Sequence, residues 1–223
     1  MAKFYEIPES KFVVFPNLPP SDWLGGLFNP TERAKSFSRR KVLRIGVLSS
    51  LTHYNLDKDS AKAENAKSED DLGILLEAMS RLKERGLKDK CVWVFFTNEN
   101  ESIRSRIGDL ANVEFRPMSP ICDYPRAVAN ADIHLCATPL QKSEFNESKS
   151  NIKVVECAAL GIPIIASHAY PYDNCLPQFN LFTGGIELGD RIEAMMGWSE
   201  SRYFNEVKDA YQRTFNQPID YFG

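Results

Sequence analysis

The chain has 223 residues, of which 43% are hydrophobic and 26% are charged, and its formal net charge is −3 at pH 7. This composition is typical of a folded protein with one main α/β domain and excludes a fibrous or disordered chain. A mildly acidic chain without a block of Lys and Arg also lacks the charge of a nucleic-acid binder, so nucleic acid is not an expected partner.

The cysteines and the hydropathy pattern indicate the compartment. Five widely spaced cysteines favour neither a disulfide framework nor a zinc site, and we expect no metal. The first ten residues lack the apolar core of a signal peptide, and no apolar run approaches the roughly 18 residues of a transmembrane segment. We therefore expect a cytoplasmic protein. The cysteines are Cys91, Cys122, Cys136, Cys157 and Cys175.

Residues 1–40 differ in composition from the rest of the chain. Prolines interrupt them, and they contain one strand-like run, Phe12–Phe15. We predict a proline-rich N-terminal arm or the remnant of an inter-domain linker. Trp23, Leu27 and Phe28 give it apolar surface, which makes them candidates for contact with a missing half of the protein or with a second copy in a homodimer.

From residue 41 to residue 216, β-branched apolar runs alternate with helical patterns, and residues 217–223 form a short tail. This alternation predicts a Rossmann-like, three-layer α/β domain with a parallel sheet of about six strands. The predicted strands are Val42–Leu48, Cys91–Phe96, Val113–Pro117, Ile133–Ala137, Ile162–Ala166 and, more weakly, Phe179–Phe182. The predicted helices are Asp70–Gly86, Ser102–Leu110, Pro125–Ala129, Asn151–Leu160, Ile186–Gly197 and Ser199–Phe215.

The segment Tyr54–Asp71 is long and polar for a connection between a strand and a helix. It is either a solvated loop or a functional lid, and the sequence leaves both interpretations open.

The strongest candidate site is the polar loop that leads into the helix Asn151–Leu160, because ligands of open parallel sheets bind at the carboxyl ends of the strands. Ser150 is the expected N-cap, which would leave the backbone amides of Ser150, Asn151 and Ile152 as free donors at the positive end of the helix. Lys149 and Lys153 add positive charge there. This combination predicts a diphosphate site.

Glu156 lies roughly 7 to 8 Å along the same helix, about the step from a diphosphate to its ribose. Its carboxylate could accept hydrogen bonds from both hydroxyls of a vicinal diol. The alternative is that Lys153 and Glu156 form an ordinary ion pair one turn apart on the helix surface.

The motif Phe145-Asn146-x-x-Lys149-Ser150-x-x-Lys153-x-x-Glu156, followed by residues 161–167 (Gly-Ile-Pro-Ile-Ile-Ala-Ser), resembles the donor-site region of group 1 retaining GT-B glycosyltransferases. Similarity at residues 14–17, 45–50 and 131–135 extends the resemblance over roughly residues 12–190. It implies a nucleoside-diphosphate-sugar donor held without an obligatory metal or other cofactor, and net retention at the anomeric carbon. In this family Glu156 matches the ribose-binding glutamate, and Lys149 with Ser150 and the amides beyond it match the diphosphate-binding helix start.

The chain departs from the family pattern at two places. Ser148 stands where the family has a first glutamate, so that carboxylate is missing or comes from Glu144 or Glu147. The turn after the first strand carries Ser50 and His53 instead of the Arg or Lys of many members, and we expect these two side chains to bond phosphate.

The loop after the third strand, residues 118–124, corresponds to the place where the family binds the nucleotide base, with Met118 and Ile121 as the apolar candidates. The alternative is a simple connection in which Asp123 caps the next helix. His134 lies within an apolar strand and is expected to be a hydrogen-bonded core residue, whereas the role of His168 stays open.

The sequence therefore predicts the donor-binding domain of a retaining glycosyltransferase, which needs a separate or missing acceptor domain and whose catalytic residues are unassigned. The alternative is a non-catalytic nucleotide-sugar-binding or assembly protein with a degenerate glycosyltransferase fold. A dinucleotide-dependent oxidoreductase is disfavoured because residues 46–50, Gly-Val-Leu-Ser-Ser, lack the glycine pattern of that fold.

Overall fold

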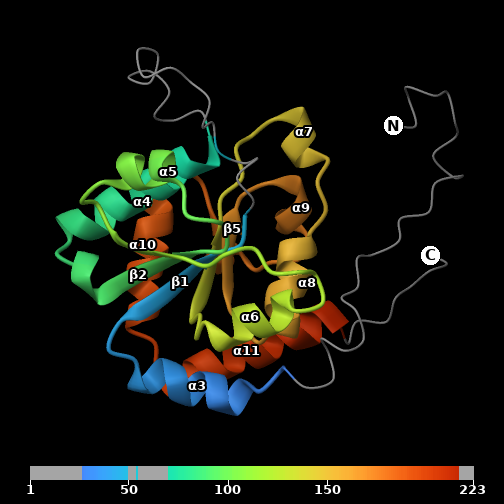
Figure 1. Cartoon of the computed structure of the whole chain (residues 1–223). Coiled ribbons are helices and arrows are strands. Elements are labelled where there is room, and N and C mark those ends of the chain that lie inside the picture. The colour runs from blue at the N-terminus through green and yellow to red at the C-terminus, as the bar shows by residue number, and fades with distance from the viewer. Residues whose placement is uncertain (1–26, 50–53, 55–69, 216–223) are drawn as a thin grey trace, which may run out of the picture.

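The computed structural model describes residues 27–49, 54 and 70–215, which form a six-stranded parallel sheet covered by helices on both faces (Figure 1). The predicted Rossmann-like, three-layer α/β fold is confirmed. The strands are β1 Leu43–Val47, β2 Cys91–Phe95, β3 Asn112–Phe115, β4 Leu135–Thr138, β5 Ile164–Ser167 and β6 Leu181–Phe182. The helices are α3 Pro30–Arg39, α4 Asp71–Glu84, α5 Glu101–Ile107, α6 Tyr124–Asn130, α7 Glu144–Glu147, α8 Ile152–Ala159, α9 Tyr170–Asp173, α10 Gly185–Met196 and α11 Glu200–Phe215, with 3-10 turns at η3 Lys88–Lys90 and η4 Gln178–Asn180.

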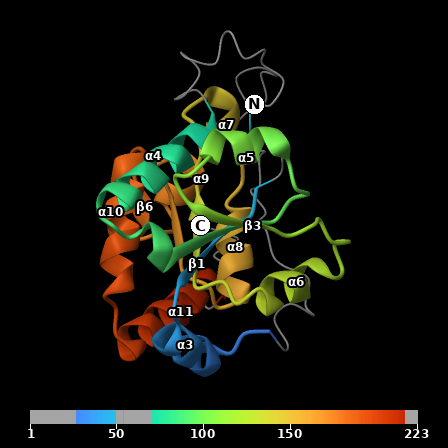
Figure 2. The same cartoon turned by 60° about the vertical axis from the view of Figure 1, so that its left-hand side comes forward.

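Two apolar cores lie on opposite faces of the sheet, because side chains alternate along each strand. One core joins Ile45, Trp93 and Phe95 to helices α3, α4, α5, α10 and α11. The other joins Val94 and Phe96 to α6, α8 and α9. Figure 2 shows α4 and α10 on one side of the sheet and α6 on the other.

The strand order is β3-β2-β1-β4-β5-β6, and β1 pairs in parallel with both β2 and β4. The order of connection therefore reverses between β1 and β4. In an open sheet of this kind the crevice at such a reversal, beyond the carboxyl ends of the strands, is where ligands bind.

For β4 and β5 the predicted starts lie two residues too early and the predicted ends one residue too early. Asp132 has a left-handed φ of 52° and Gly161 a φ of 66°, so the chain is still turning where the strands were expected to start. β6 is only two residues long because η4 occupies the start of the predicted run.

Helix α3 lies within the predicted arm and was missed. Asn29 caps it by accepting a hydrogen bond from the Glu32 amide at 3.0 Å, and Pro30 occupies its first turn. Its residue Phe37 is fully buried and stacks on Tyr203 of α11, with ring centroids 4.1 Å apart. The domain boundary drawn at residue 41 therefore leaves out a helix that belongs to the core.

The apolar residues Leu27 and Phe28, expected to face a partner, pack on this domain itself. The Phe28 ring stacks on Tyr211 of α11 at 4.1 Å, and Leu27 packs against the core beneath α6 and α8. Trp23 lies outside the described residues, as does most of the segment Tyr54–Asp71.

Within the described part of the chain, no helix combines the length and the apolar character needed to cross a bilayer. The five cysteines are all free.

Candidate functional site

A cavity of about 150 Å³ lies at the carboxyl ends of β1, β2 and β3. Its wall includes Lys153 of α8, which follows β4, so the cavity reaches across the point where the strand order reverses. The Phe96 and Tyr124 rings meet edge to face on its wall, with centroids 6.4 Å apart. The lining residues are Leu48, Ser49, Phe96, Pro117, Met118, Ser119, Tyr124 and Lys153.

Helix α8 begins one residue later than expected, with Asn151 rather than Ser150 at the N-cap. The reason is the one-turn helix α7, after which the Lys149 amide bonds back to the Asn146 carbonyl at 3.1 Å and delays the next helix. The first amide to bond into α8 is that of Val154, to the Asn151 carbonyl at 2.9 Å. The amides of Ile152 and Lys153 precede it, in the position of helix-start donors.

Lys149 is partly buried in the turn just before α8, with its Nζ 5.1 Å from the centre of the Phe145 ring. Burial lowers the pKa of Lys149, and the nearby charge of Asp71 acts in the opposite direction. Asp71 is itself buried and accepts the Gln141 amide hydrogen at 2.6 Å. A partly desolvated ammonium of this kind interacts more strongly with an anion than an exposed lysine does.

Lys153 and Glu156 form the ion pair that was the alternative interpretation of their spacing, with Nζ 2.9 Å from Oε2. The pair is not an ordinary surface pair, because the side chains are only 26% and 13% exposed and Lys153 lines the cavity. Burial raises the pKa of the Tyr124 hydroxyl, and the Glu156 charge adds to this effect. Glu156 therefore lies beside the cavity as well.

Of the two carboxylates near Ser148, that of Glu147 has another partner. The Ser148 hydroxyl donates to the Glu144 carbonyl at 2.8 Å, and Glu147 accepts the Tyr170 amide hydrogen at 2.8 Å. Glu147 thus ties α7 to the start of α9, and Glu144 is exposed.

The remaining predicted site residues fall into two groups. Ser50 and His53 lie outside the described residues. Of the base-binding candidates, Met118 lines the cavity, whereas Ile121 is 82% exposed and stands outside its lining. Asp123 immediately precedes α6, at its N-cap position.

His134 is a hydrogen-bonded core residue, as expected. Its Nδ1 accepts the Arg44 amide hydrogen at 3.0 Å, its Nε2 lies 3.4 Å from the Ser36 hydroxyl, and the side chain is buried. Burial lowers the pKa of His134 to about 4. The imidazole is therefore neutral at physiological pH.

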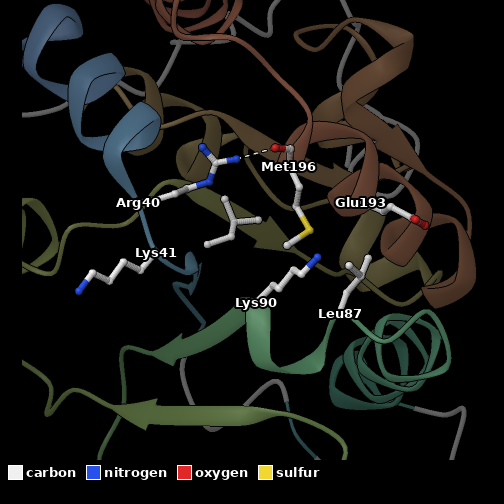
Figure 3. A pocket seen from close by; sticks show the side chains of 7 residues that line it. Arg40, Lys41, Leu87, Lys90, Glu193 and Met196 are labelled. Carbon is white, nitrogen blue, oxygen red and sulfur yellow. Dashed lines mark hydrogen bonds between the residues drawn. The ribbon is translucent and has the colours of Figure 1, made fainter.

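A larger cavity, of about 350 Å³, lies between α3, α10 and the start of β2, at the amino edge of the sheet (Figure 3). No motif in the sequence pointed to it. Its Arg40 side chain donates to the carbonyls of Phe37 and, at 2.6 Å, Met196, so this guanidinium joins α3 to α10. Lys41 and Lys90 also line it, with Glu193 opposite. It is remote from Lys153 and the 150 Å³ cavity, which lie at the carboxyl edge.

Among the described residues, no group of three or more His, Cys, Asp or Glu side chains is arranged to hold a metal ion.

No protein-family model matches the sequence, and no curated protein matches it. Solved structures do. The catalytic domain of cholesterol-α-glucosyltransferase from Helicobacter pylori is similar at a TM-score of 0.55 and 13% identity, over 78% of this chain and 98% of that one.

Two further solved structures are similar over 92% of this chain. They are an α,α-trehalose-phosphate synthase (UDP-forming) from Burkholderia vietnamiensis, with a TM-score of 0.57 and 10% identity, and HepE from Anabaena in complex with UDP, with a TM-score of 0.51 and 15% identity. This chain spans 49% and 51% of their lengths. At these identities the likeness shows the fold, which is that of the C-terminal-like domain of GT-B glycosyltransferases.

Proposed function

We propose that this chain binds the nucleoside-diphosphate-sugar donor of a glycosyltransferase. The observation that carries the proposal is the meeting of two features at one edge of the sheet. An apolar cavity with two aromatic walls lies on one side of the reversal in strand order, and the positive start of α8 lies on the other, with Lys153 shared between them. A nucleotide needs this combination of a flat apolar surface and a site for anions.

The parts of the donor follow from this arrangement. The base occupies the cavity beside Met118, with Ile121 at its exposed margin. The diphosphate lies against Lys149, Ser150 and the first amides of α8, including those of Asn151 and Ile152. We extend the proposal to Ser50 and His53, which follow β1 in the sequence and lie outside the described residues, as further phosphate contacts. No metal ion or other cofactor takes part.

Lys153 and Glu156 have separate proposed roles in binding the donor, one toward the phosphates and the other toward the ribose. Phosphate oxygens compete with Glu156 for the Lys153 ammonium, since both are anionic acceptors. When Lys153 turns to the phosphate, the Glu156 carboxylate becomes available to the ribose hydroxyls. The Lys153–Glu156 ion pair and the proposed donor contacts are thus alternative pairings of the same two side chains.

The reaction we propose is retaining transfer from a UDP or GDP sugar, with the acceptor bound by a separate domain or partner chain. The resemblance of residues 145–167 to retaining enzymes supports this reaction, as does the UDP bound in the HepE structure. This chain also spans only about half the length of two structural neighbours. A homodimer in the cytoplasm is the assembly and compartment we expect.

The second candidate is a binding or assembly protein that holds a nucleotide sugar without turning it over. Ser148 favours this function, because the position carries a hydroxyl in place of the family's carboxylate and donates to the Glu144 backbone carbonyl. The neighbouring Glu147 carboxylate already accepts the Tyr170 amide hydrogen. Release of free nucleoside diphosphate from UDP- or GDP-sugars, measured with and without candidate acceptors, separates the two functions, because only a transferase releases it.

Isothermal titration with UDP, GDP and their common sugar conjugates tests donor binding. We expect dissociation constants between the micromolar and low millimolar ranges, weakened about tenfold by Lys149→Ala and by Glu156→Ala, since each removes a charged contact. Lys142→Ala, which removes an exposed lysine before α7, is the matched control and should bind as the wild type does. Absence of binding to every nucleotide would refute the proposal.

A further inference from the structure

We infer that His168, which lies against Asp173, contacts the β-phosphate of the donor, the phosphate that bears the sugar. This inference rests on the proposed function and adds to it a residue that the motif around α8 does not contain. His168 follows β5 directly, so it lies at the same carboxyl edge of the sheet as the proposed phosphate site.

The imidazole has a defined orientation. Its Nδ1 lies 2.8 Å from Asp173 Oδ1, at the end of α9, and this oxygen is buried and makes no hydrogen bond among the described residues. The His168 amide donates to the Phe182 carbonyl of β6 at 2.8 Å, which anchors the backbone. With one ring nitrogen on the carboxylate, Nε2 is the nitrogen available to a ligand, and the side chain is 47% exposed.

The segment that carries this pair is joined to the start of α8. The Leu140 amide donates to the Ser167 hydroxyl at 2.8 Å, which links the loops after β4 and β5. The Cys175 thiol, two residues beyond Asp173, donates to the Pro171 and Tyr172 carbonyls of α9, at 3.4 and 3.3 Å, and lies near the side chain of Asn151, the N-cap of α8. In Figure 1, α9 stands directly above the first turn of α8.

The two lysines at this edge of the sheet already interact with carboxylates, which leaves room for a further phosphate-binding side chain. Lys153 is already shared with Glu156, and Lys149 lies within reach of the Asp71 charge. A diphosphate placed there competes with Glu156 and Asp71 for the charges of these two lysines. With Nδ1 facing the Asp173 carboxylate, the Nε2 nitrogen of His168 is placed to bond a phosphate oxygen.

The test compares a nucleoside diphosphate with its monophosphate, using UDP and UMP, or GDP and GMP, according to which the wild type binds. Titrations at fixed pH and salt should show that His168→Gln weakens diphosphate binding about tenfold and leaves monophosphate binding unchanged. Asp173→Asn should weaken the diphosphate less, because it leaves the imidazole in place without its anchor. Lys142→Gln is the charge-matched control on the same edge.

Each result has one meaning. Loss of diphosphate affinity alone supports the contact, provided thermal unfolding shows that the variant is folded. Equal loss for both nucleotides, or wild-type affinity in His168→Gln, overturns it. If Lys149→Ala weakens binding while His168→Gln does not, the donor site stands and only the His168 contact fails. If the wild type binds neither nucleotide, the proposed function fails with it.

Discussion

The two partners of His134 explain why a histidine lies in a strand-end core. Arg44 offers its backbone amide to Nδ1, and Ser36 of α3 approaches Nε2, so the neutral ring satisfies groups from two elements. A charged ring would be desolvated without a sufficient counter-charge, and burial accordingly lowers the pKa of His134 to about 4.

This lowered pKa predicts a loss of stability in acid. In the unfolded chain His134 takes up a proton below about pH 6.5, whereas in the folded protein it does so only near pH 4. Between these two pH values the unfolded state therefore binds more protons than the folded state. The stabilising contribution is full above pH 6.5 and falls as the pH drops toward 4, by up to about 3 kcal/mol. Urea unfolding at pH 7 and at pH 4.5 measures it.

His134→Gln is the control for this prediction, because carboxylates also titrate in the same range. The difference in unfolding free energy between the two pH values should shrink in the variant. An unchanged difference would show that His134 does not contribute.

The buried carboxylate of Asp70 leads to a second prediction, on the stability of the fold. It caps α4 through the Gly73 amide at 2.8 Å and accepts two hydrogen bonds from Arg106 of α5, at 2.6 and 2.9 Å. Arg106→Gln removes the charged partner on α5 from this carboxylate, which is only 6% exposed, and should destabilise the fold by about 3 kcal/mol in chemical denaturation.

Arg104→Gln provides the comparison on the same helix. Arg104 pairs with Glu99, and both side chains are well exposed, so the loss should stay below about 1 kcal/mol. Equal losses in the two variants would contradict the importance of burial for the Arg106 pair.

At the scale of elements, α10 lies unusually close to α4 because glycines face it. A Cβ atom at Gly185 would lie 2.3 Å from the Ile74 carbonyl oxygen and 2.3 Å from the Glu77 Cβ, and one at Gly189 would lie 2.8 Å from the Arg81 side chain. The backbone oxygen cannot move aside without shifting a helix. Gly185→Ala should therefore lower stability by about 1–3 kcal/mol, measured by urea unfolding.

Gly197→Ala is the matched control at the end of α10. The nearest neighbour of its added Cβ would be the Ala194 carbonyl oxygen at 3.6 Å, an ordinary contact. A loss of stability similar to that of Gly185→Ala would mean that the α4–α10 contact is not the cause.

The sequence predicted most elements because their signals were local. The periodic apolar residues of α4 and the β-branched runs of β1 and β2 carry their own pattern. Helix α3 was missed because prolines dominate its surroundings, although Asn29, Pro30 and Glu32 form a helix start that could have revealed it. The one-turn helices α7 and α9 are too short for a periodic signal.

The candidate site was predictable to a smaller extent. The position of Lys149, Lys153 and Glu156 beside one helix start followed from spacing alone. The burial of the Lys153–Glu156 pair, the N-cap at Asn151 and the His168–Asp173 contact depend on how the loops after β4 and β5 fold against each other, and spacing does not encode that.

At the scale of the molecule, the sheet has two edges with different surfaces. The carboxyl edge combines the 150 Å³ cavity with the start of α8, whereas the amino edge holds the larger cavity lined by Arg40, Lys41 and Lys90. Size alone would favour the amino edge. The reversal of strand order and the aromatic walls favour the carboxyl edge for a nucleotide.

Mapping a bound nucleotide on the protein tests this central claim most directly. In ¹H–¹⁵N spectra of the labelled chain titrated with UDP or GDP, we expect the largest amide shifts at Met118, at residues 149–153 and at Glu156. Shifts confined to Arg40, Lys41 and Lys90, or an unchanged spectrum at millimolar nucleotide, would contradict it.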